Sequence, residues 1–256
     1  MPQKRLTAPM YRPRESLSRF MPETARPFEE CTVGKMLAVI LVGCDGREAE
    51  AVRTVLAGET LLARSARMLG EVAPERVVVS VPDERLATLA TAMGLEAQVR
   101  DQNSHDLEGA LEQALSLVGD GFEQVLAIDP LLPLRRAGRL AAAVRLSTRD
   151  GADTVFSCHR ESSLLWQRTE MGLVPYFDPT RRPGLEDSAG ALPWLKEDGG
   201  FYLLRVDALR RYGSRHAGRI APLETEPGEA VLADTPSGLS VCRVLMAEAA
   251  ASAGAS

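Results

Sequence analysis

The chain has 256 residues, of which 45% are hydrophobic and 25% charged, values in the ordinary range of globular proteins. A chain of this length forms one large domain or two small ones, and it buries enough surface to fold without a disulfide or a structural metal. The formal net charge of −5 argues against a general nucleic-acid-binding protein.

Cysteine spacing and hydropathy indicate where the protein works. The four cysteines lie far apart and lack the spacing of a zinc site or a disulfide framework. No apolar run reaches the roughly 20 residues that a membrane-spanning helix needs, and the start of the chain lacks the apolar core of a signal peptide. We therefore expect a cytoplasmic protein with reduced thiols and no membrane or nucleic-acid partner.

Residues 1–34 differ in composition from the rest of the chain. They contain five prolines and no sustained apolar period, which predicts an extended or disordered arm. Six basic and four acidic side chains give this arm a net charge of about +2. The arm either contacts a partner subunit or an anionic surface, or it is a tail without a partner.

From residue 35 to residue 150, short apolar runs alternate with stretches of helical spacing. The predicted strands are residues 36–42, 76–81, 96–100 and 124–128. The predicted helices are residues 61–69, 84–93, 106–118, with Asp106 as N-cap, and 137–149. This alternation predicts βαβ units, and hence an α/β fold with a Rossmann-like, mostly parallel sheet and helices on both faces. Ligands of such sheets bind beyond the carboxyl ends of the strands, which points to the loops starting at Gly43, Pro82 and Asp129.

The second half of the chain has fewer helical stretches. Its predicted strands are residues 154–158, 199–204 and 230–234, and its predicted helices are residues 206–212 and 238–250. Residues 159–198 are predicted to be irregular, and residues 251–256 form a tail of small side chains. The sequence thus predicts one domain over residues 35–250, in which residues 160–198 stand apart from the regular alternation.

A polar loop, Gly43-Cys-Asp-Gly-Arg47, follows the first predicted strand. A glycine-containing turn at this place can present backbone N–H groups to phosphates. Any turn between a strand and a helix also favours Gly and Asp. The loop has neither the Gly-Lys-Ser/Thr ending of a P-loop nor a GxGxxG pattern, so the residues alone leave phosphate binding and a plain turn both open.

Two aspartates end later predicted strands. Asp129 either holds a metal or a ribose hydroxyl, or it caps the following helix at a rigid Pro turn. Asp234 either binds Mg²⁺, which usually takes one or two carboxylates plus phosphate oxygens, or caps the last helix. Arg135 faces either a phosphate or solvent. The three histidines show no metal-ligand spacing.

Six segments occur in an order that is similar to one known family. They are residues 56–65 after the first strand (LAGETLLARS), 78–87 (VVSVPDERLA), 128–135 (IDPLLPLR), 152–157 (ADTVFS), 198–202 (DGGFY) and 233–239 (ADTPSGL). In this order, over residues 36–248, the chain resembles the acylneuraminate (sialate-type) cytidylyltransferases. These enzymes couple CTP to a nonulosonic acid or related sugar acid, forming a CMP-sugar and pyrophosphate.

The resemblance implies a nucleotide-diphospho-sugar transferase-like fold, Mg²⁺ as cofactor, and CTP and a sugar acid as substrates. It also implies a homodimer in which residues 160–198 exchange contacts between subunits. The implied site consists of Arg47 and Arg53 as catalytic cations, Gly43, Gly46, Asp129 and Arg135 for the nucleotide, Arg182 and Tyr202 for the substrate, and Asp234 for the metal.

The chain departs from the family at positions that the family uses for nucleotide binding and catalysis. The family's nucleotide loop reads R-x-G-S-K-G-x-P-x-K-N, but Val42 stands here at its first Arg, and its second Lys falls near Ala51. Asp129 replaces the Gln that reads the nucleotide, and Leu232 replaces one of two late carboxylates. Removing one preorganised donor typically costs about 2.7–4 kcal/mol of transition-state stabilisation.

Three hypotheses therefore remain open from the sequence. The chain is a Mg²⁺-dependent cytidylyltransferase in which other residues substitute for the lost cations. Alternatively, it is a catalytically inactive paralogue that binds a sugar, a nucleotide or a partner protein. The third hypothesis is a nucleotidyltransferase that uses another nucleotide or acceptor.

Overall fold

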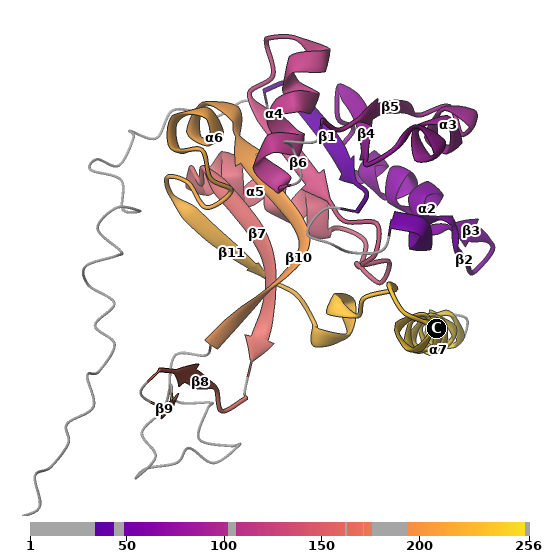
Figure 1. The fold of residues 1–256 in the computed structure, drawn as a ribbon, viewed down its shortest axis with the longest axis vertical. Helices are drawn as coiled ribbons and strands as arrows, with labels where there is room; N and C mark the ends of the chain where they lie inside the picture. The colour runs from indigo at the N-terminus through magenta and orange to yellow at the C-terminus, as the bar shows by residue number, and fades with distance from the viewer. Residues whose placement is uncertain are drawn as a thin grey trace, which may run out of the picture.

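A computed structural model describes residues 34–43, 49–101, 106–161, 163–170, 172–175 and 194–253. Its centre is a seven-stranded sheet of order β11-β7-β10-β6-β1-β4-β5 (Figure 1). The strands are β1 (Met36–Leu41), β4 (Arg76–Val81), β5 (Glu96–Val99), β6 (Gln124–Ile128), β7 (Thr154–Glu161), β10 (Trp194–Arg205) and β11 (Ile220–Glu224). Strand β10 runs antiparallel to both of its neighbours, and all other pairs are parallel. The predicted mostly parallel sheet is confirmed.

Helices cover both faces of this sheet. The helices are α2 (Leu61–Met68), α3 (Glu84–Ala92), α4 (Leu107–Val118), α5 (Arg139–Asp150), α6 (Val206–Tyr212) and α7 (Pro236–Ala253). Buried side chains of α4 and α6 pack on one face, and those of α2, α3, α5 and α7 belong to the core on the other. The remaining elements are the 3₁₀ helices η2 (Ala49–Arg53), η3 (Leu69–Glu71) and η6 (Pro227–Ala230), the pair β2 (Val55–Leu56) and β3 (Glu59–Thr60), and the pair β8 (Trp166–Thr169) and β9 (Gly172–Pro175).

Strand β1 explains why the sequence folds around this centre. All six of its residues are buried, and they alternate between the two cores. Met36, Ala38 and Ile40 pack on one side, and Leu37, Val39 and Leu41 on the other. A continuous apolar run is required where helices cover both faces of a parallel sheet. The strand ends at Leu41, and after buried Val42 the chain reaches the loop that begins at Gly43.

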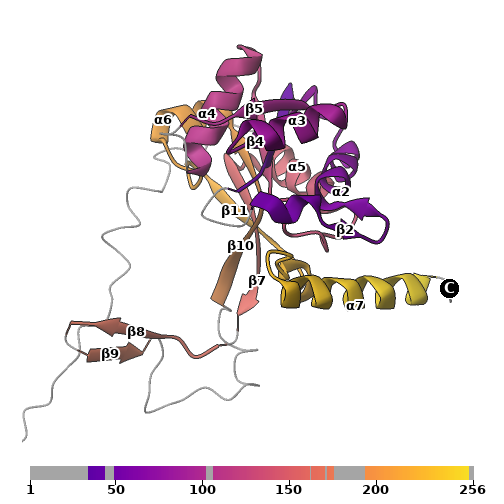
Figure 2. The same ribbon diagram turned by 45° about the vertical axis from the view of Figure 1, so that its right-hand side comes forward.

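Predicted and observed elements differ mainly after residue 158. The predicted strand at residues 230–234 is wrong, because residue 230 is the last residue of η6 and residues 231–235 form a non-strand segment that leads into α7. The last strand of the sheet is instead β11, which pairs with β7. The described part of residues 159–198 is not irregular, since β7, β8, β9 and β10 occupy most of it. In Figures 1 and 2 the β8–β9 hairpin lies away from the main sheet.

Other predictions concern the helices and the ends of the chain. Asp106 is the N-cap of α4, as predicted, and its Oδ1 accepts from the Gly109 N–H at 2.8 Å. Helix α7 continues to Ala253, beyond the predicted end at residue 250. The predicted arm lies outside the described residues except for Gly34. Within the described part of the chain, no helix is long and apolar enough to cross a membrane.

Glu229, in η6, anchors the segment that leads to α7. It is only 6% exposed, and its carboxylate accepts from the Arg139 guanidinium at 2.6 Å and from the Arg136 N–H at 2.9 Å. It also accepts from the Glu226 N–H at 3.1 Å, completing a capping box. Burial alone would raise the pKa of Glu229, but these hydrogen bonds outweigh it and hold the pKa below its usual value.

Replacing Glu229 tests this anchor. We expect Glu229→Gln to lower the free energy of unfolding at neutral pH by about 3 kcal/mol, as is typical when a buried ion pair loses one partner. Because the pKa is depressed in the folded state, this contribution is fully present above about pH 4.5 and is lost as the pH falls further. Urea denaturation of both proteins at pH 7 and pH 3 measures the difference.

The matched control is Glu224→Gln, which removes an exposed ion pair with Arg160. This change should cost less than about 1 kcal/mol. Equal losses in the two variants, or a Glu229→Gln difference that persists at pH 3, would contradict the assignment.

Candidate functional site at the carboxyl edge of the sheet

Three loops from distant parts of the sequence meet at one edge of the sheet. Strands β1 and β6 are parallel neighbours, so the loops that follow them begin side by side (Figure 1). The Ala233 N–H donates to the Leu131 carbonyl oxygen at 2.8 Å, which holds the segment before α7 against the turn after β6. Val42, Leu131 and Ala233 also share one hydrophobic core. Gly43, Asp129 and Asp234 are thereby placed at the same edge.

The loop after β1 begins with a backbone conformation that favours glycine. Gly43 has a φ of +69°, in the left-handed region that side chains rarely adopt. A Cβ at this position would lie 3.0 Å from the Cβ of Ala49. The turn is therefore tightly packed against the start of η2. The predicted site residues Gly46 and Arg47 lie outside the described residues.

Asp129 stabilises the turn that follows β6. Its Oδ1 accepts from the Leu131 N–H at 2.8 Å, and its own N–H donates to the Gly200 carbonyl oxygen at 3.1 Å. A side chain that accepts from the N–H two residues later forms an Asx turn. Asp129 is therefore not the cap of α5, whose N-cap is Gly138.

Arg135 does not face solvent, and its guanidinium binds the backbone of β10. It is 6% exposed, its guanidinium donates to the Gly200 carbonyl oxygen, and its charge lies 5.8 Å from the ring centroid of Phe201. Burial lowers the pKa of Arg135, and the charges of Asp129 and Asp198 oppose that effect. Arg135 thus joins the turn after β6 to β10.

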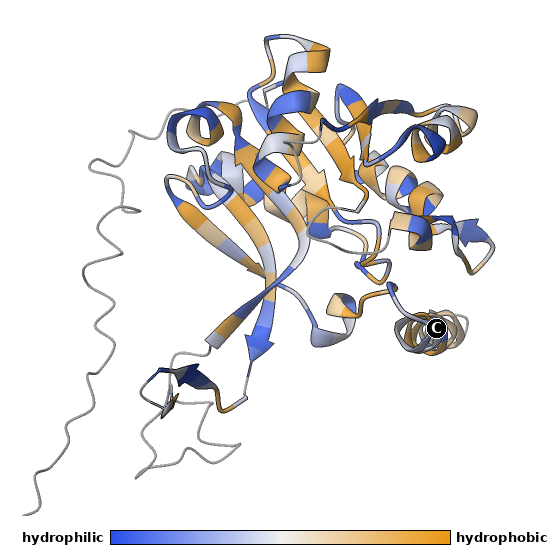
Figure 3. Cartoon of the chain, viewed as in Figure 1, coloured by the Kyte–Doolittle hydropathy of each residue, from blue (hydrophilic) through white to orange (hydrophobic). Residues whose placement is uncertain are grey.

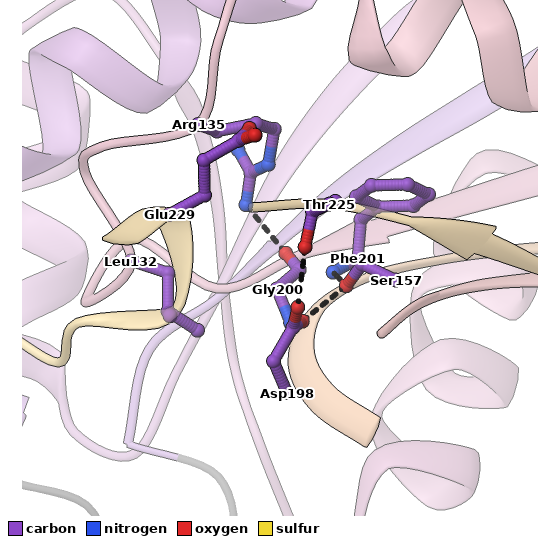
Figure 4. A pocket seen from close by; sticks show the side chains of 8 residues that line it. All are labelled: Leu132, Arg135, Ser157, Asp198, Gly200, Phe201, Thr225 and Glu229. Atoms are coloured by element: carbon purple, nitrogen blue, oxygen red, sulfur yellow. Dashed lines mark hydrogen bonds between the residues drawn. The ribbon is translucent and has the colours of Figure 1, made fainter. Parts of the chain in front are cut away.

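A small pocket lies beside Arg135 (Figure 4). The side chains of Leu132, Arg135, Ser157, Asp198, Phe201, Thr225 and Glu229 line it together with Gly200. Asp198 accepts from the Ser157 hydroxyl, from the Gly200 N–H at 2.8 Å and from the Thr225 hydroxyl at 3.2 Å. These groups come from β7, β10 and the chain after β11, so sequence spacing did not indicate Ser157, Thr225 or Glu229. The one available signal was the polar run around Asp198.

Asp234 has a different environment from the other carboxylates. It is half-buried, and no described residue donates a hydrogen bond or forms an ion pair with its side chain. The hydroxyl that accepts from the first turn of α7 belongs to Thr235, which receives the Gly238 N–H at 3.1 Å. Asp234 therefore does not cap this helix, and its carboxylate is available to a ligand.

The described residues also limit which kind of Mg²⁺ site is possible. They contain no group of three His, Cys, Asp or Glu side chains that could hold a metal by themselves. Mg²⁺ usually binds through one or two carboxylates and completes its ligands with water and substrate phosphates. Asp234 is therefore compatible with a Mg²⁺ site that a phosphate ligand completes. It is not compatible with a Mg²⁺ site formed by protein side chains alone.

Two other predicted site residues interact with glutamates in this structure. Arg53 is exposed on η2, with its guanidinium 3.6 Å from Glu50. Tyr202 belongs to the core on the face of α4 and α6, opposite Phe201. Its hydroxyl donates to Glu197, and burial together with Glu197 raises its pKa above the usual value. The structure thus brings Gly43, Asp129, Arg135 and Asp234 to one edge but directs Tyr202 away, and Arg182 lies outside the described residues.

The topology defines the class of fold. A mostly parallel seven-stranded sheet with a single reversed strand, β10, and helices on both faces is a nucleotide-diphospho-sugar transferase-like fold. The chain is similar to N-acylneuraminate cytidylyltransferase A of Danio rerio, with 28% identity over an alignment of 159 positions that covers 59% of this chain and 36% of the relative. The chain therefore spans about a third of that relative's length. The resemblance to the acylneuraminate cytidylyltransferases is confirmed.

Solved structures support the same fold. A CMP:2-keto-3-deoxy-manno-octonic acid synthetase complexed with CTP matches 85% of this chain and 99% of its own, with a TM-score of 0.61 and 17% identity. The 4-diphosphocytidyl-2C-methyl-D-erythritol synthase of Anaerococcus prevotii matches 83% of this chain and 96% of its own, with a TM-score of 0.60 and 8% identity. No model of a known protein family matches the sequence.

The buried position of Arg135 predicts a structural effect that its neighbour Arg136 should not show. We expect Arg135→Met to lower the free energy of unfolding by about 2–4 kcal/mol, because the Gly200 carbonyl loses its charged donor and nearby carboxylates lose a cation. Arg136→Met is the control, since the Arg136 side chain is 66% exposed, and it should cost less than about 0.5 kcal/mol. Urea denaturation distinguishes the two. Similar values for both variants would show that Arg135 does not hold β10.

Proposed function

We propose that this chain is a cytidylyltransferase-like protein that binds CTP at the carboxyl edge of the sheet and transfers CMP to a sugar acid. The relative and the structural neighbours support the class of reaction. The observation that carries the proposal is the Ala233–Leu131 hydrogen bond. It holds the segment that leads to Asp234 against the turn after β6, and no described residue pairs with the Asp234 carboxylate.

In the proposed reaction, a hydroxyl oxygen of the sugar acid attacks the α-phosphorus of CTP. The bond between that phosphorus and the bridging oxygen breaks, pyrophosphate leaves, and the hydroxyl proton passes to solvent or a base. The protein does little covalent work in such a transfer, and catalysis comes from positioning and charge neutralisation. The backbone at Gly43 and the turn at Asp129 would bind the nucleotide. Asp234 would hold Mg²⁺, whose contribution is to neutralise phosphate charge.

The remaining members of the proposed site come from the resemblance. Arg47 and Gly46 would complete the nucleotide loop, and Arg53 would reach the phosphates by leaving Glu50. Arg182 would contact the carboxylate of the acceptor, because a guanidinium can bind a carboxylate in bidentate fashion. Arg135 would act from inside the fold, through its bond to Gly200 of β10. Tyr202 packs in the core on the opposite face and would not contact the substrate from there.

A second candidate function is binding without turnover. It is favoured by the burial of Val42 and Ala51, which are 0% and 8% exposed and stand where the resembled family carries cations. Arg53, the nearest described substitute, is paired with Glu50. A protein with these features would retain a nucleotide or sugar site and regulate or assist a partner, as an inactive paralogue.

The first prediction of the proposal concerns CTP and Asp234. We expect CTP with Mg²⁺ to stabilise the wild-type protein against thermal unfolding, by about 2.7 kcal/mol when CTP is at 100 times its Kd. Asp234→Asn should remove the Mg²⁺-dependent part of this stabilisation. Asp120→Asn, an exposed change before the amino end of β6 (98% exposed side chain), should leave it intact. Pyrophosphate release with CTP, Mg²⁺ and a panel of nonulosonic acids measures turnover.

The outcomes separate the candidates. Stabilisation with pyrophosphate release supports the enzyme, and stabilisation without release from any acceptor supports the binding-only protein. No stabilisation at millimolar CTP would exclude the enzyme and favour an inactive paralogue that binds a sugar or a partner protein.

We also propose that the chain forms a homodimer in the cytoplasm through an extension that consists of β8, β9 and the start of β10. Figure 2 shows this extension projecting from the sheet. It exposes several large apolar side chains, namely Leu165 (45% exposed), Trp166 (53%), Leu173 (60%), Trp194 (54%) and Leu195 (38%). Apolar residues concentrated on one exposed element are typical of a protein interface.

The dimer is tested by changing two of these leucines. We expect the wild-type chain to sediment at twice its monomer mass of 27.7 kDa, and the double variant Leu165→Asp/Leu173→Asp to sediment as a monomer, because a buried interface would take in two unpaired charges. Leu117→Asp changes an exposed leucine on α4 (49% exposed) and should remain dimeric. A monomeric wild-type chain, or a double variant that still dimerises, would refute the proposed interface.

A further inference from the structure

Arg100, which follows β5, is a buried charged residue at the same edge of the sheet. It is 8% exposed, and its N–H donates to the Val81 carbonyl oxygen at 2.9 Å. Its Nη1 donates to the carbonyl oxygen of Ser80 at 2.8 Å and to the Ser80 hydroxyl at 3.3 Å, and its Nη2 donates to the carbonyl oxygen of Val42 at 2.8 Å. One side chain therefore ties together the carboxyl ends of β1, β4 and β5.

The bond to Val42 determines how the Gly43 loop begins. The peptide bond between Val42 and Gly43 is trans, and the N–H of a trans peptide points opposite to its carbonyl. Arg100 holds the Val42 carbonyl on its own side, so the Gly43 N–H points away from the guanidinium. No described residue accepts a hydrogen bond from this N–H.

The charge of Arg100 reinforces this geometry. A guanidinium keeps its proton in proteins, and its field is stronger where water is excluded. Directed backbone N–H groups and a nearby cation are the features with which proteins bind phosphates. The described part of the loop supplies no such cation at positions 42 and 51, where buried Val42 and Ala51 stand.

We propose that Arg100 is a positioning residue of the nucleotide site. It directs the Gly43 N–H toward a phosphate of the nucleotide, and it places a positive charge beneath the turn. The identity of the ligand rests on the proposed function. The orientation of Gly43 by Arg100 is a property of the ligand-free protein and can be tested separately.

The test compares Arg100→Met and Arg100→Lys with the control Arg76→Met. Arg76 joins β4 and β5, two of these three strands, at their amino ends through an ion pair with Glu96. In ligand-free protein, we expect the Gly43 amide signal in the ¹⁵N NMR spectrum to shift strongly in Arg100→Met and little in Arg76→Met. The readouts with ligand are the affinities for MgCTP and for inorganic tripolyphosphate, measured by calorimetry.

Both affinities should fall about 10- to 100-fold in Arg100→Met, the range expected when a charge-assisted hydrogen bond is lost. Arg76→Met should leave both unchanged. Arg100→Lys should be intermediate, because an ammonium lacks the rigid fork that reaches two carbonyls. If Arg100→Met does not fold, Arg100→Lys carries the comparison through the same three readouts.

The outcomes separate the two proposals. An unmoved Gly43 amide in a folded Arg100 variant overturns the positioning role, whatever the protein binds. A loss of CTP affinity without a loss of tripolyphosphate affinity also overturns it, because Arg100 would then act on the base and not on the phosphates. Failure of the wild-type protein to bind either ligand refutes the proposed function, and the Gly43 shift then decides the role of Arg100.

Discussion

Two buried arginines donate to backbone carbonyls at this edge of the sheet, where a buried carbonyl that lacks a donor is costly. Arg100 donates to the ends of β1 and β4, and Arg135 donates to Gly200 in β10. The loops after β1 and β6 both start from points that a guanidinium holds.

Most of the parallel half of the fold could be predicted because burial on both faces leaves a plain signal. Strands β4 and β6 match their predicted ranges, since continuous apolar runs bounded by polar loops allow few other structures. Strand β11 was missed because it lies at the edge, is half exposed and contains Pro222. The wrong strand at residues 230–234 has a related cause. Its apolar residues pack on the core through the Ala233–Leu131 bond and not through strand pairing.

The site was only partly predictable, because the topology places loops but does not pair side chains. The rule that ligands bind beyond the carboxyl ends of strands located Gly43 and Asp129. It could not show that Arg135 turns inward to Gly200, a contact 65 residues apart in sequence. The alternation of a strand could have shown that Phe201 and Tyr202 face opposite cores. Arg100 also has a signal in the sequence, because it is a charged residue at the carboxyl end of a predicted strand.

Most carboxylates near this edge are already hydrogen-bonded within the protein, and this limits how the proposed metal can bind. Asp198 takes three hydrogen bonds, Glu229 is paired with Arg139, and Asp129 uses one oxygen to hold its own turn. Asp234 is the carboxylate of this edge that the described residues leave without a donor. A cation held by one carboxylate must take its other ligands from water and phosphate oxygens. In the proposed site, the binding of the metal and the binding of the nucleotide would therefore be coupled. Because such coupling is reciprocal, each ligand would raise the protein's affinity for the other.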